Sequence, residues 1–481
     1  MWLGIDIGTS GVKAVIVDDA GSIVDQATAP LGVSRSKPLW TEQSPDDWWQ
    51  AVQTAVCSIP ARVRGQVQGI GLSGQMHGAV LLDASDQVLR PAILWNDGRS
   101  QDECAELQAR VPNLHDIAGN LAMPGFTAPK LLWVRRHEPD IFARVSKVLL
   151  PKDYVRLILT GDHASDMSDS AGTLWLDVAR RAWSRDVLDA CGLDERQMPT
   201  LYEGSAPTGT LRPAAAEALG LPIVPVAGGG GDNAVGAVGV GVTEPGDAFL
   251  SLGTSGVIFA VSNGYASNPA QAVHAFCHAL PGRWHQMSVI LSAASCLDWV
   301  TKLTGYAGVP AAVAAAEAAD SAQVPIFLPY LSGERTPHND PKASGVFVGL
   351  RHDTDRGALV RSVLEGVAFA LADGAKALRA AGTSIEALTV IGGGARSTFW
   401  GRILSAALEA RLDYVSGGDV GPALGAAKLA RMAVTSEPIE AVCPQPPVEK
   451  SVHPDPDISD EICARRERFR ALYPALKDEF R

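Results

Sequence analysis

The chain of 481 residues carries 41 Lys and Arg against 53 Asp and Glu, a formal net charge of −12, and 46% of it is hydrophobic. This composition is typical of a folded globular protein, and the negative charge argues against nucleic acid or anionic membrane surfaces as partners. Because a single hydrophobic core stops growing at about 250–300 residues, the length predicts two large domains.

The first thirty residues predict a strand, a tight turn and a second strand. An apolar run over 2–8 leads into the turn GTSG, and a second run over 12–19 precedes a further turn and the strand 22–29. Asp6 and Lys13 interrupt the apolar runs, which excludes a signal peptide here. No run of about 18 uncharged apolar residues occurs, so no membrane span is expected.

The rest of the first half alternates between predicted helices and strands. We expect strands over 67–74 and 79–83 and helices over five ranges, 45–59, 100–111, 127–137, 152–160 and 183–191. The GxGxxG pattern at 69–74 is followed by turn and strand residues, so it argues against a dinucleotide-binding fold. The chain contains no GxxxxGK[ST] motif and is therefore not a P-loop protein.

The pentapeptide GTSGV occurs twice, at 8–12 and 253–257, about half a chain apart and each time between two apolar runs. Each half then ends in Gly-rich segments that lead from a strand into a helix, at 223–241, 390–408 and 417–433. The sequence therefore predicts a duplicated unit, with domains over 1–243 and 244–481. Residues 436–460 are rich in Pro and predict a surface loop, and 461–478 predict a docking helix.

The seven cysteines are scattered and form no CxxC pair, which predicts reduced thiols in the cytoplasm and neither a disulfide framework nor a zinc site. Each GTSG turn exposes backbone NH groups and hydroxyls that can hold phosphate oxygens without formal charge. Asp6, beside the first turn, suits a ligand of phosphate-bound Mg²⁺, direct or through water. A plain turn with a capping Asp is the alternative, and two copies across a cleft favour a nucleotide site.

Three further segments allow both a functional and a structural interpretation. In GGGGDN, Asp232 is either a helix N-cap or a general base beside a substrate hydroxyl. The side chains of two polar segments, SGQMHG (73–78) and ILWNDGRS, suit a polyol ligand. The structural alternative is an ordinary polar loop in which His77 is a turn residue. The segment GGGARSTFW (392–400) either forms a flat surface for a purine base or allows close packing of a helix on a strand. Trp299 either contacts the adenine or, by preference, belongs to the core.

Together these motifs resemble the FGGY family of carbohydrate kinases, which have an actin-like, ribonuclease H-like ATPase fold. The resemblance covers almost the whole chain. It is carried by DIGTSGVK (6–13), SLGTSG (251–256), GGGDNA (229–234), GGGARS (392–397), GFTAPKLLWVRRH (125–137) and GVFVGL…LVRSVLEGVAF (345–369). Ala358, in the last of these segments, occupies a usually polar position. The resemblance implies an α/β fold of two such domains that flank a deep catalytic cleft.

GQMHG, ILWNDGR and FLPYLSGERTPHND (327–340) are most similar to the members of this family that act on D-xylulose. The resemblance implies transfer of the γ-phosphoryl group of ATP to the C5 hydroxyl, with Mg²⁺, in the cytoplasm, and a homodimer as the family's assembly. It implies catalytic roles for Asp232, as general base, and for Asp6, at Mg²⁺ through water. The expected sugar-binding residues are Met76, His77, Asp232 and Asn233. The expected nucleotide-binding residues are Gly8, Thr9, Ser10, Lys13, Gly253, Thr254, Ser255, Gly393, Gly394 and Ser397.

Other interpretations stay open at this point. A catalytically silent sensor on the same fold would lack Asp6 or Asp232, and both are present. A dehydrogenase built on GIGLSG would need a helix after this segment. Within the kinase interpretation, another pentulose, or 1-deoxyxylulose as a side substrate, is also possible.

Overall fold

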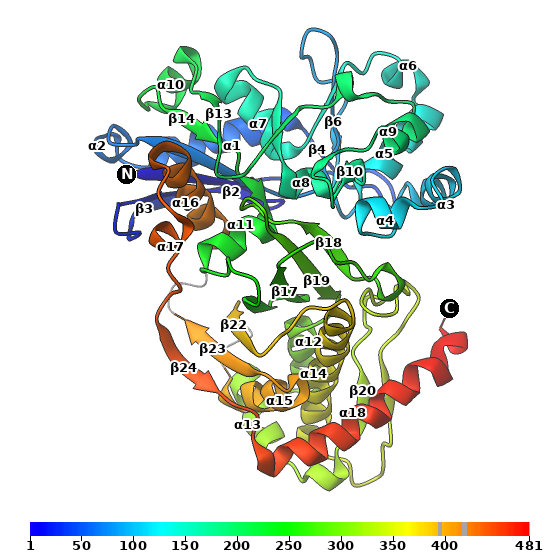
Figure 1. The fold of residues 1–481 in the computed structure, drawn as a ribbon. Helices are drawn as coiled ribbons and strands as arrows, with labels where there is room; N and C mark the ends of the chain where they lie inside the picture. Colours follow the sequence, from blue (N-terminus) through cyan, green and yellow to red (C-terminus); the bar gives the residue numbers. More distant parts are fainter. Residues whose placement is uncertain (393–396, 416–420, 481) are drawn as a thin grey trace.

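The computed structural model describes residues 1–392, 397–415 and 421–480, and it shows two α/β lobes, one above the other (Figure 1). The described strands of the upper lobe form a sheet in the order β13-β14-β5-β1-β2-β3, with β15 paired to β5. These strands are β1 (Trp2–Ile7), β2 (Gly11–Val17), β3 (Ile23–Pro30), β5 (Gly69–Gly74), β13 (Pro207–Thr210), β14 (Pro225–Ala227) and β15 (Gly230–Gly231).

The sheet of the lower lobe follows the order β18-β19-β17-β16-β22-β23-β24. Its strands are β16 (Ala248–Leu252), β17 (Gly256–Ser262), β18 (His274–Cys277), β19 (Trp284–Ile290), β22 (Ala387–Ile391), β23 (Arg411–Val415) and β24 (Val448–Val452). In both sheets the hairpin strands are antiparallel and the next neighbour, β5 or β22, runs parallel to the first strand. The two equivalent hairpins predicted from GTSGV are therefore confirmed, because each copy of the turn joins the equivalent strand pair.

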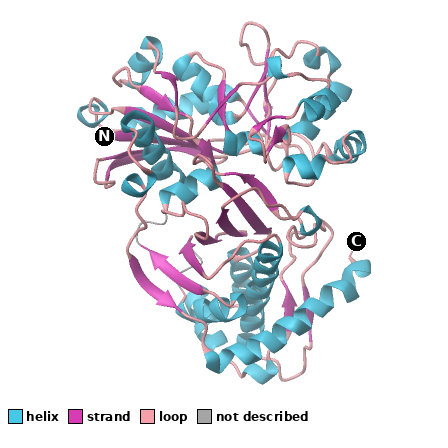
Figure 2. Ribbon diagram, in the orientation of Figure 1, coloured by secondary structure: helices cyan, strands magenta, loops and turns pink. Residues whose placement is uncertain are grey.

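The predicted helices of the first half are confirmed to within a few residues. They are α1 (Pro45–Ser58), α3 (Gln101–Arg110), α5 (Thr127–His137), α7 (Pro151–Thr160) and α9 (Arg185–Cys191). Shorter helices complete this half: α2 (Ala61–Arg64), α4 (Leu114–Ala118), α6 (Pro139–Phe142), α8 (Met167–Ala171), α10 (Pro213–Leu219) and α11 (Asp232–Gly239). Figure 2 shows helices on both sides of the upper sheet, as expected for a sheet buried on two faces.

Helices of the second half pack mainly around one long central helix, α14 (Arg356–Ala380), which contacts β19 and β17. The others are α12 (Ala294–Thr304), α13 (Val309–Ala318), α15 (Thr398–Leu408), α16 (Gly421–Thr435), α17 (Ile439–Val442) and α18 (Pro456–Leu476). Short strand pairs outside the two sheets are β4 (Glu42–Gln43) with β7 (Ala92–Ile93), β6 (Val80–Leu82) with β8 (Lys147–Leu149), β9 (Ala164–Asp166) with β12 (Thr200–Tyr202), β10 (Leu176–Asp177) with β11 (Ala182–Trp183), and β20 (Ile326–Leu328) with β21 (Val346–Val348). No helix of the described residues is both long and apolar enough to span a bilayer.

Helix α16 belongs to the second half of the sequence but packs on β1 and β5 of the upper sheet and against α11. Glycines make this approach possible: a Cβ on Gly4 would lie 1.8 Å from the carbonyl oxygen of Ala423, and one on Gly71 would lie 1.8 Å from that of Ala426. Part of the glycine content therefore serves helix packing and not ligand binding. The division into domains over 1–243 and 244–481 stays a prediction. Helix α16 lies in the second of these ranges but packs on the sheet of the first.

The prediction of a loop over 436–460 is wrong in part. Residues 448–452 form β24, which pairs antiparallel with β23 at the edge of the lower sheet, and α17 precedes it. Three consecutive polar residues, Glu449 to Ser451, lie in this strand, and all of it but Val452 is exposed, so its composition resembles that of a loop. The predicted docking helix is confirmed as α18, which begins at Pro456 and buries Ile462 and Phe469.

Candidate active site

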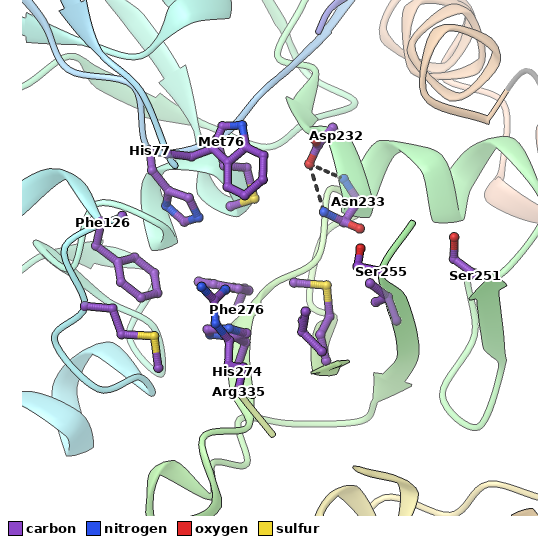
Figure 3. Close-up of a pocket in the computed structure, with 16 residues that line it drawn as sticks. Met76, His77, Phe126, Asp232, Asn233, Ser251, Ser255, His274, Phe276 and Arg335 are labelled. Carbon is purple, nitrogen blue, oxygen red and sulfur yellow. Dashed lines mark hydrogen bonds between the residues drawn. The ribbon is translucent and has the colours of Figure 1, made fainter. Parts of the chain in front are cut away.

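A pocket of about 340 Å³ lies between the lobes, at the second GTSG turn and the start of α11 (Figure 3). Both halves of the chain contribute side chains to it. The lining residues are Met76, His77, Trp95, Met123, Gly125, Phe126, Asp232, Asn233, Ser251, Ser255, Val257, His274, Phe276, Met287, Val289 and Arg335. Four of the residues predicted from sequence, namely Met76, His77, Asp232 and Asn233, therefore meet in one cavity, together with Ser255 of the second turn.

The first hairpin places Asp6 at the end of β1, directly across the strand pair from Lys13 on β2. The Oδ1 atom of Asp6 is buried and accepts no hydrogen bond from any described residue. Burial and the nearby charge of Asp232 raise the pKa of Asp6 to about 7, while the nearby hydroxyl of Ser73 and the charge of Lys13 lower it. Lys13 thus faces the carboxylate and is only half-buried.

Thr9 in the first turn is held by the protein itself. Its hydroxyl donates to Oε1 of Gln75 at 2.9 Å and accepts from Nε1 of Trp95 at 2.9 Å, and its carbonyl accepts from Gln43. Because the hydroxyl is engaged, the backbone NH groups of this turn are the groups left for a phosphate. Gly8 closes the turn through a backbone hydrogen bond to Gly11, and Ser10 is exposed.

The second turn is braced from α12. The carbonyl oxygens of Gly253 and Thr254 accept hydrogen bonds from the backbone NH groups of Ala294 and Ala293, each 2.9 Å long. The side chain of Thr254 is exposed and that of Ser255 faces the pocket. Ser251, two residues before the turn, also lines the pocket, and sequence reasoning did not single it out.

Asp232 is the first residue of α11, and the N-cap is Gly231. The interpretation of Asp232 as a plain N-cap is therefore wrong. Its carboxylate accepts two hydrogen bonds from Asn233, one from the backbone N at 2.7 Å and one from Nδ2 at 2.9 Å. Burial raises the pKa of Asp232 to about 6, against these two hydrogen bonds, which lower it. A Cβ on Gly231 would lie 2.8 Å from Cγ of Met76, so glycine is needed for Met76 to lie against this segment.

A fully buried charge cluster lies behind the segment that carries Asp232. The ammonium of Lys152 contacts the carboxylates of Asp153 at 2.6 Å, Asp166 at 2.8 Å and Asp169 at 3.1 Å. Burial raises the pKa of Asp169 well above its usual range, while the charge of Lys152 lowers it. Arg156 joins the cluster, with its Nε 3.7 Å from Asp153, so two cationic side chains face three buried carboxyl groups and the buried charges are paired.

The same cluster reaches the segment that carries Asp232 through two side chains. Arg156 donates to the backbone carbonyl oxygens of Ala227, at 2.6 Å, and Gly228. The hydroxyl of Ser168 donates to Asp166 at 2.5 Å and accepts from the backbone NH of Gly231 at 3.1 Å. The backbone on the N-terminal side of Asp232 is therefore fixed from both ends.

His77 has a defined proton position. Its Nδ1 lies 2.6 Å from the carbonyl oxygen of Gly172, which can only accept, so Nδ1 carries the proton and Nε2 is an acceptor. Burial lowers the pKa of His77 to about 3, and the charges of Lys130 and Arg335 lower it as well, so the ring is neutral. The backbone of His77, at φ 69°, is held by hydrogen bonds to its carbonyl oxygen from Lys130 at 2.8 Å and Thr127 at 3.1 Å.

A second wall of the pocket was not predicted. His274 and Phe276 lie on β18 with their rings stacked, and Phe126 packs edge-on against both His77 and His274. Phe126 and Arg335 belong to segments singled out by the resemblance, and Trp95 belongs to the polar segment ILWNDGRS. His274 and Phe276 lie in an apolar strand with no local signal, so only the tertiary structure identifies them.

The expected adenosine site is only partly within the described residues. Gly393 and Gly394 lie outside them, while Ser397 is the N-cap of α15 and accepts from the backbone NH of Trp400 at 3.2 Å. Trp299 stacks on Phe327, with ring centroids 5.7 Å apart, beside the core of the lower lobe. The preferred core interpretation of Trp299 thus agrees with the packing.

Comparison with known proteins gives consistent results over the whole chain. A family model for the N-terminal domain of the FGGY family of carbohydrate kinases matches residues 1–239, and one for its C-terminal domain matches 248–434. The chain is 58% identical to the xylulose kinase of Escherichia coli (strain K12) over 479 residues, 99% of each chain.

Solved structures agree with this. A crystal structure of a xyloylose kinase from Brucella ovis superposes with a TM-score of 0.96 at 51% identity, covering 99% of each chain. That of a xylulose kinase from Rhodospirillum rubrum gives a TM-score of 0.93 at 29% identity, covering 100% of this chain and 99% of the other. The expected two-domain α/β fold is confirmed.

Proposed function

The chain belongs to the FGGY family of carbohydrate kinases, and we propose that its reaction is the transfer of the γ-phosphoryl group of ATP to O5 of D-xylulose. The observation that carries the proposal is the single pocket in which Asp232, Met76 and His77 meet the second GTSG turn. The high identity to xylulose kinases over the full length supports D-xylulose as the sugar.

Asp232 is proposed as the general base for the attacking C5 hydroxyl, in line with the transferred group. A pKa of about 6 leaves the carboxylate ionised at neutral pH while keeping it more basic than an exposed Asp. Because phosphoryl transfer passes through a loose transition state, orientation of the hydroxyl is most of what this residue supplies. The hydrogen bonds from Asn233 fix the carboxylate for this purpose.

The described residues contain no cluster of three or more His, Cys, Asp or Glu that could cage a metal ion. Mg²⁺ in kinases is typically held by one or two carboxylates, phosphates and water, and the unpartnered Oδ1 of Asp6 fits that requirement. We propose that Asp6 holds Mg²⁺ through water. When bound, Mg²⁺ neutralises charge on the phosphate oxygens, and it would also lower the raised pKa of Asp6.

The remaining predicted roles are proposed on their positions. The backbone NH groups at Thr9, Ser10 and Thr254, the hydroxyls of Thr254 and Ser255, and the charge of Lys13 would hold the phosphates of ATP. Gly8 and Gly253 would shape the two turns, because their NH groups donate to the carbonyl oxygens of Gly11 and Ser255. His77 would accept a sugar hydroxyl at Nε2, and Met76 would contact the carbon chain. The assignment of Gly393, Gly394 and Ser397 to adenosine stays a prediction. So do the homodimer and the absence of nucleic-acid and membrane partners.

We place the reaction in the cytoplasm, where ATP is available and where all seven cysteines, none of them in a disulfide, would stay reduced. A dehydrogenase built on GIGLSG loses support, because β5 is followed by a turn and the short strand β6 and not by a helix. A catalytically silent sensor is the remaining alternative, and it differs in whether ADP is formed.

The test is a coupled ADP-release assay with and without D-xylulose, with other ketoses, including 1-deoxyxylulose, as a panel. We expect release that depends on D-xylulose, and phosphorus NMR should place the phosphate on C5. Asp232→Ala should abolish turnover while both substrates still bind, and His77→Ala should raise KM for the sugar. The exposed Asp353→Asn is the matched control and should behave as the wild type. Sugar-independent ADP release, or turnover retained in Asp232→Ala, would contradict the proposal.

A further inference from the structure

Arg335 reaches the sugar pocket from the second half of the chain, on a backbone that is held on both sides. The preceding Glu334 accepts at Oε1 from the backbone NH groups of Leu291, at 3.0 Å, and of Arg335 itself, at 2.7 Å. The following Thr336 donates from its hydroxyl to the carbonyl oxygen of Ala272 at 2.9 Å. The position of Arg335 is therefore set by the fold of the lower lobe.

The guanidinium of Arg335 is one of the groups that line the pocket (Figure 3). It makes no hydrogen bond or ion pair with a side chain or carbonyl anywhere in the described parts of the chain. Every other described part of this wall is apolar or neutral, including Phe276 and His274. A half-buried positive charge at the pocket wall, without a partner among the described side chains and carbonyl groups, is available to donate hydrogen bonds to a ligand.

His274 is also neutral, and its proton can be assigned. Asn120 donates from Nδ2 to the carbonyl oxygens of Ala118 and Ala275, both at 2.9 Å, so its Oδ1 is the acceptor that faces His274. Nδ1 of His274, at 2.8 Å, therefore carries the proton, and Nε2 is left as an acceptor. Burial lowers the pKa of His274 well below its usual range, and the charge of Arg335 acts in the same direction.

This end of the pocket thus offers two imidazole acceptors, on His77 and His274, and one strong donor group, on Arg335. An α-hydroxyketone matches that pattern, because its hydroxyl donates and its carbonyl oxygen only accepts. Furthermore, O5 of a 2-pentulose is the ring oxygen of the furanose form and is free for phosphorylation only in the open chain. The reactive form of such a sugar necessarily carries a free C2 carbonyl.

We propose that Arg335 is a specificity-determining residue that donates hydrogen bonds to the C2 carbonyl oxygen of the open-chain ketose. This inference rests on the proposed function, since it takes O5 to lie at Asp232. Arg335 selects the open chain over the furanose and the ketose over the corresponding polyol. Because it belongs to the lower lobe while His77 belongs to the upper one, the bound sugar also bridges the two lobes.

The test compares Arg335→Met and Arg335→Lys with the matched control Arg351→Met, an exposed arginine of the same half. Dissociation constants for D-xylulose and for xylitol, which lacks the carbonyl, are measured by titration calorimetry. We expect Arg335→Met to weaken D-xylulose binding by about 10- to 100-fold, because it removes a hydrogen bond from a charged donor. Xylitol binding to Arg335→Met should weaken by less than about 3-fold. Arg335→Lys should recover part of the lost affinity for D-xylulose. Melting curves check that each variant is folded.

A second readout follows the carbonyl itself. Carbon NMR of D-xylulose labelled at C2 should show the bound open-chain ketone shifted downfield in the wild type and in Arg351→Met. In Arg335→Met, at saturating sugar, the signal should return towards its position in free ketone. Equal losses for the two ligands, unchanged D-xylulose binding, or an unmoved signal would overturn the inference. Failure of the proposed function is distinct, because the wild type itself would then not release ADP with D-xylulose.

Discussion

Lys130 donates a hydrogen bond of 2.8 Å from its side-chain nitrogen to the backbone carbonyl oxygen of His77. The lysine is fully buried, and burial lowers its pKa well below the usual range. It does not line the pocket, so it acts on the sugar through the backbone of His77. Lys130, which belongs to the segment 125–137 that carries the family resemblance, thus positions the backbone of His77, a proposed sugar-binding residue.

Replacing this lysine tests the positioning role. Lys130→Met keeps most of the buried volume and removes the donor, so the His77 backbone is held by Thr127 alone. We expect KM for D-xylulose to rise about 3- to 10-fold with kcat changed far less, as for loss of one hydrogen bond. Steady-state kinetics measure this, with the exposed Lys376→Met as the control. A loss confined to kcat would contradict the role.

The buried cluster around Lys152 should affect catalysis and not binding. Ser168→Ala removes the hydroxyl that links Asp166 to the backbone NH of Gly231, and with it one restraint on Asp232. We expect kcat to fall about 3- to 30-fold while the dissociation constants of sugar and ATP stay within about 2-fold. Arg156→Lys should likewise lower kcat and leave the dissociation constants unchanged. Arg62→Met, at the surface, is the control and should change neither. Weakened sugar binding with normal kcat would refute this assignment.

The pH dependence should report the two carboxylates. With pKa values of about 7 for Asp6 and 6 for Asp232 in the ligand-free protein, kcat/KM should fall as pH drops below this range, where both carboxyls become protonated. His77, with a pKa of about 3, does not titrate there. A pH profile of His77→Gln should therefore keep the same acidic limb. Loss of that limb in His77→Gln would show that the histidine and not the carboxylates controls it.

Asp6 should make the ligand-free protein less stable as pH rises. Its pKa is raised from 3.8 to about 7 in the folded state, so the folded protein holds this proton more tightly than the unfolded chain. The stabilisation is complete below about pH 4 and is lost as pH rises through 7. At pH 8, Asp6→Asn should therefore have an unfolding free energy about 1–4 kcal/mol higher than that of the wild type. Its melting temperature should be higher as well.

The advantage of Asp6→Asn should shrink towards pH 4, where the wild-type carboxyl is neutral as well. Thermal melting across this pH range without ligands measures it, with Asp353→Asn as a control that shows no such trend. If Asp6→Asn were less stable than the wild type at pH 8, the buried carboxylate would not carry an electrostatic cost.

Close helix packing can be tested at Gly71. A Cβ there would lie 1.8 Å from a backbone oxygen of α16, which cannot move without shifting the helix. We expect Gly71→Ala to lower the unfolding free energy by more than about 3 kcal/mol, measured by denaturant unfolding. Gly32→Ala, where no atom lies within 4 Å, is the control and should change stability little. Equal stability of the two variants would mean that α16 is not packed as described.

Much of this protein was determined by the sequence alone. The repeated GTSGV predicted two equivalent hairpins with Asp6 beside the first, the Gly-rich segment 223–241 predicted Asp232, and the polar segment SGQMHG predicted Met76 and His77. These features are readable because turns, strand alternation and cap positions depend on neighbours within a few residues. The loop prediction over 436–460 failed for the same reason, since an exposed edge strand is defined by its partner β23 and not by its own composition.

Tertiary structure alone decided the rest. It brought His274 and Phe276 from an apolar strand and Arg335 from a distant loop to the same cavity, and placed Arg156 against the carbonyl oxygens before Asp232. It also returned α16 to the first sheet and raised the pKa values of Asp6 and Asp232. Each of these depends on burial and on contacts between residues far apart in the chain, which arise only in the folded protein.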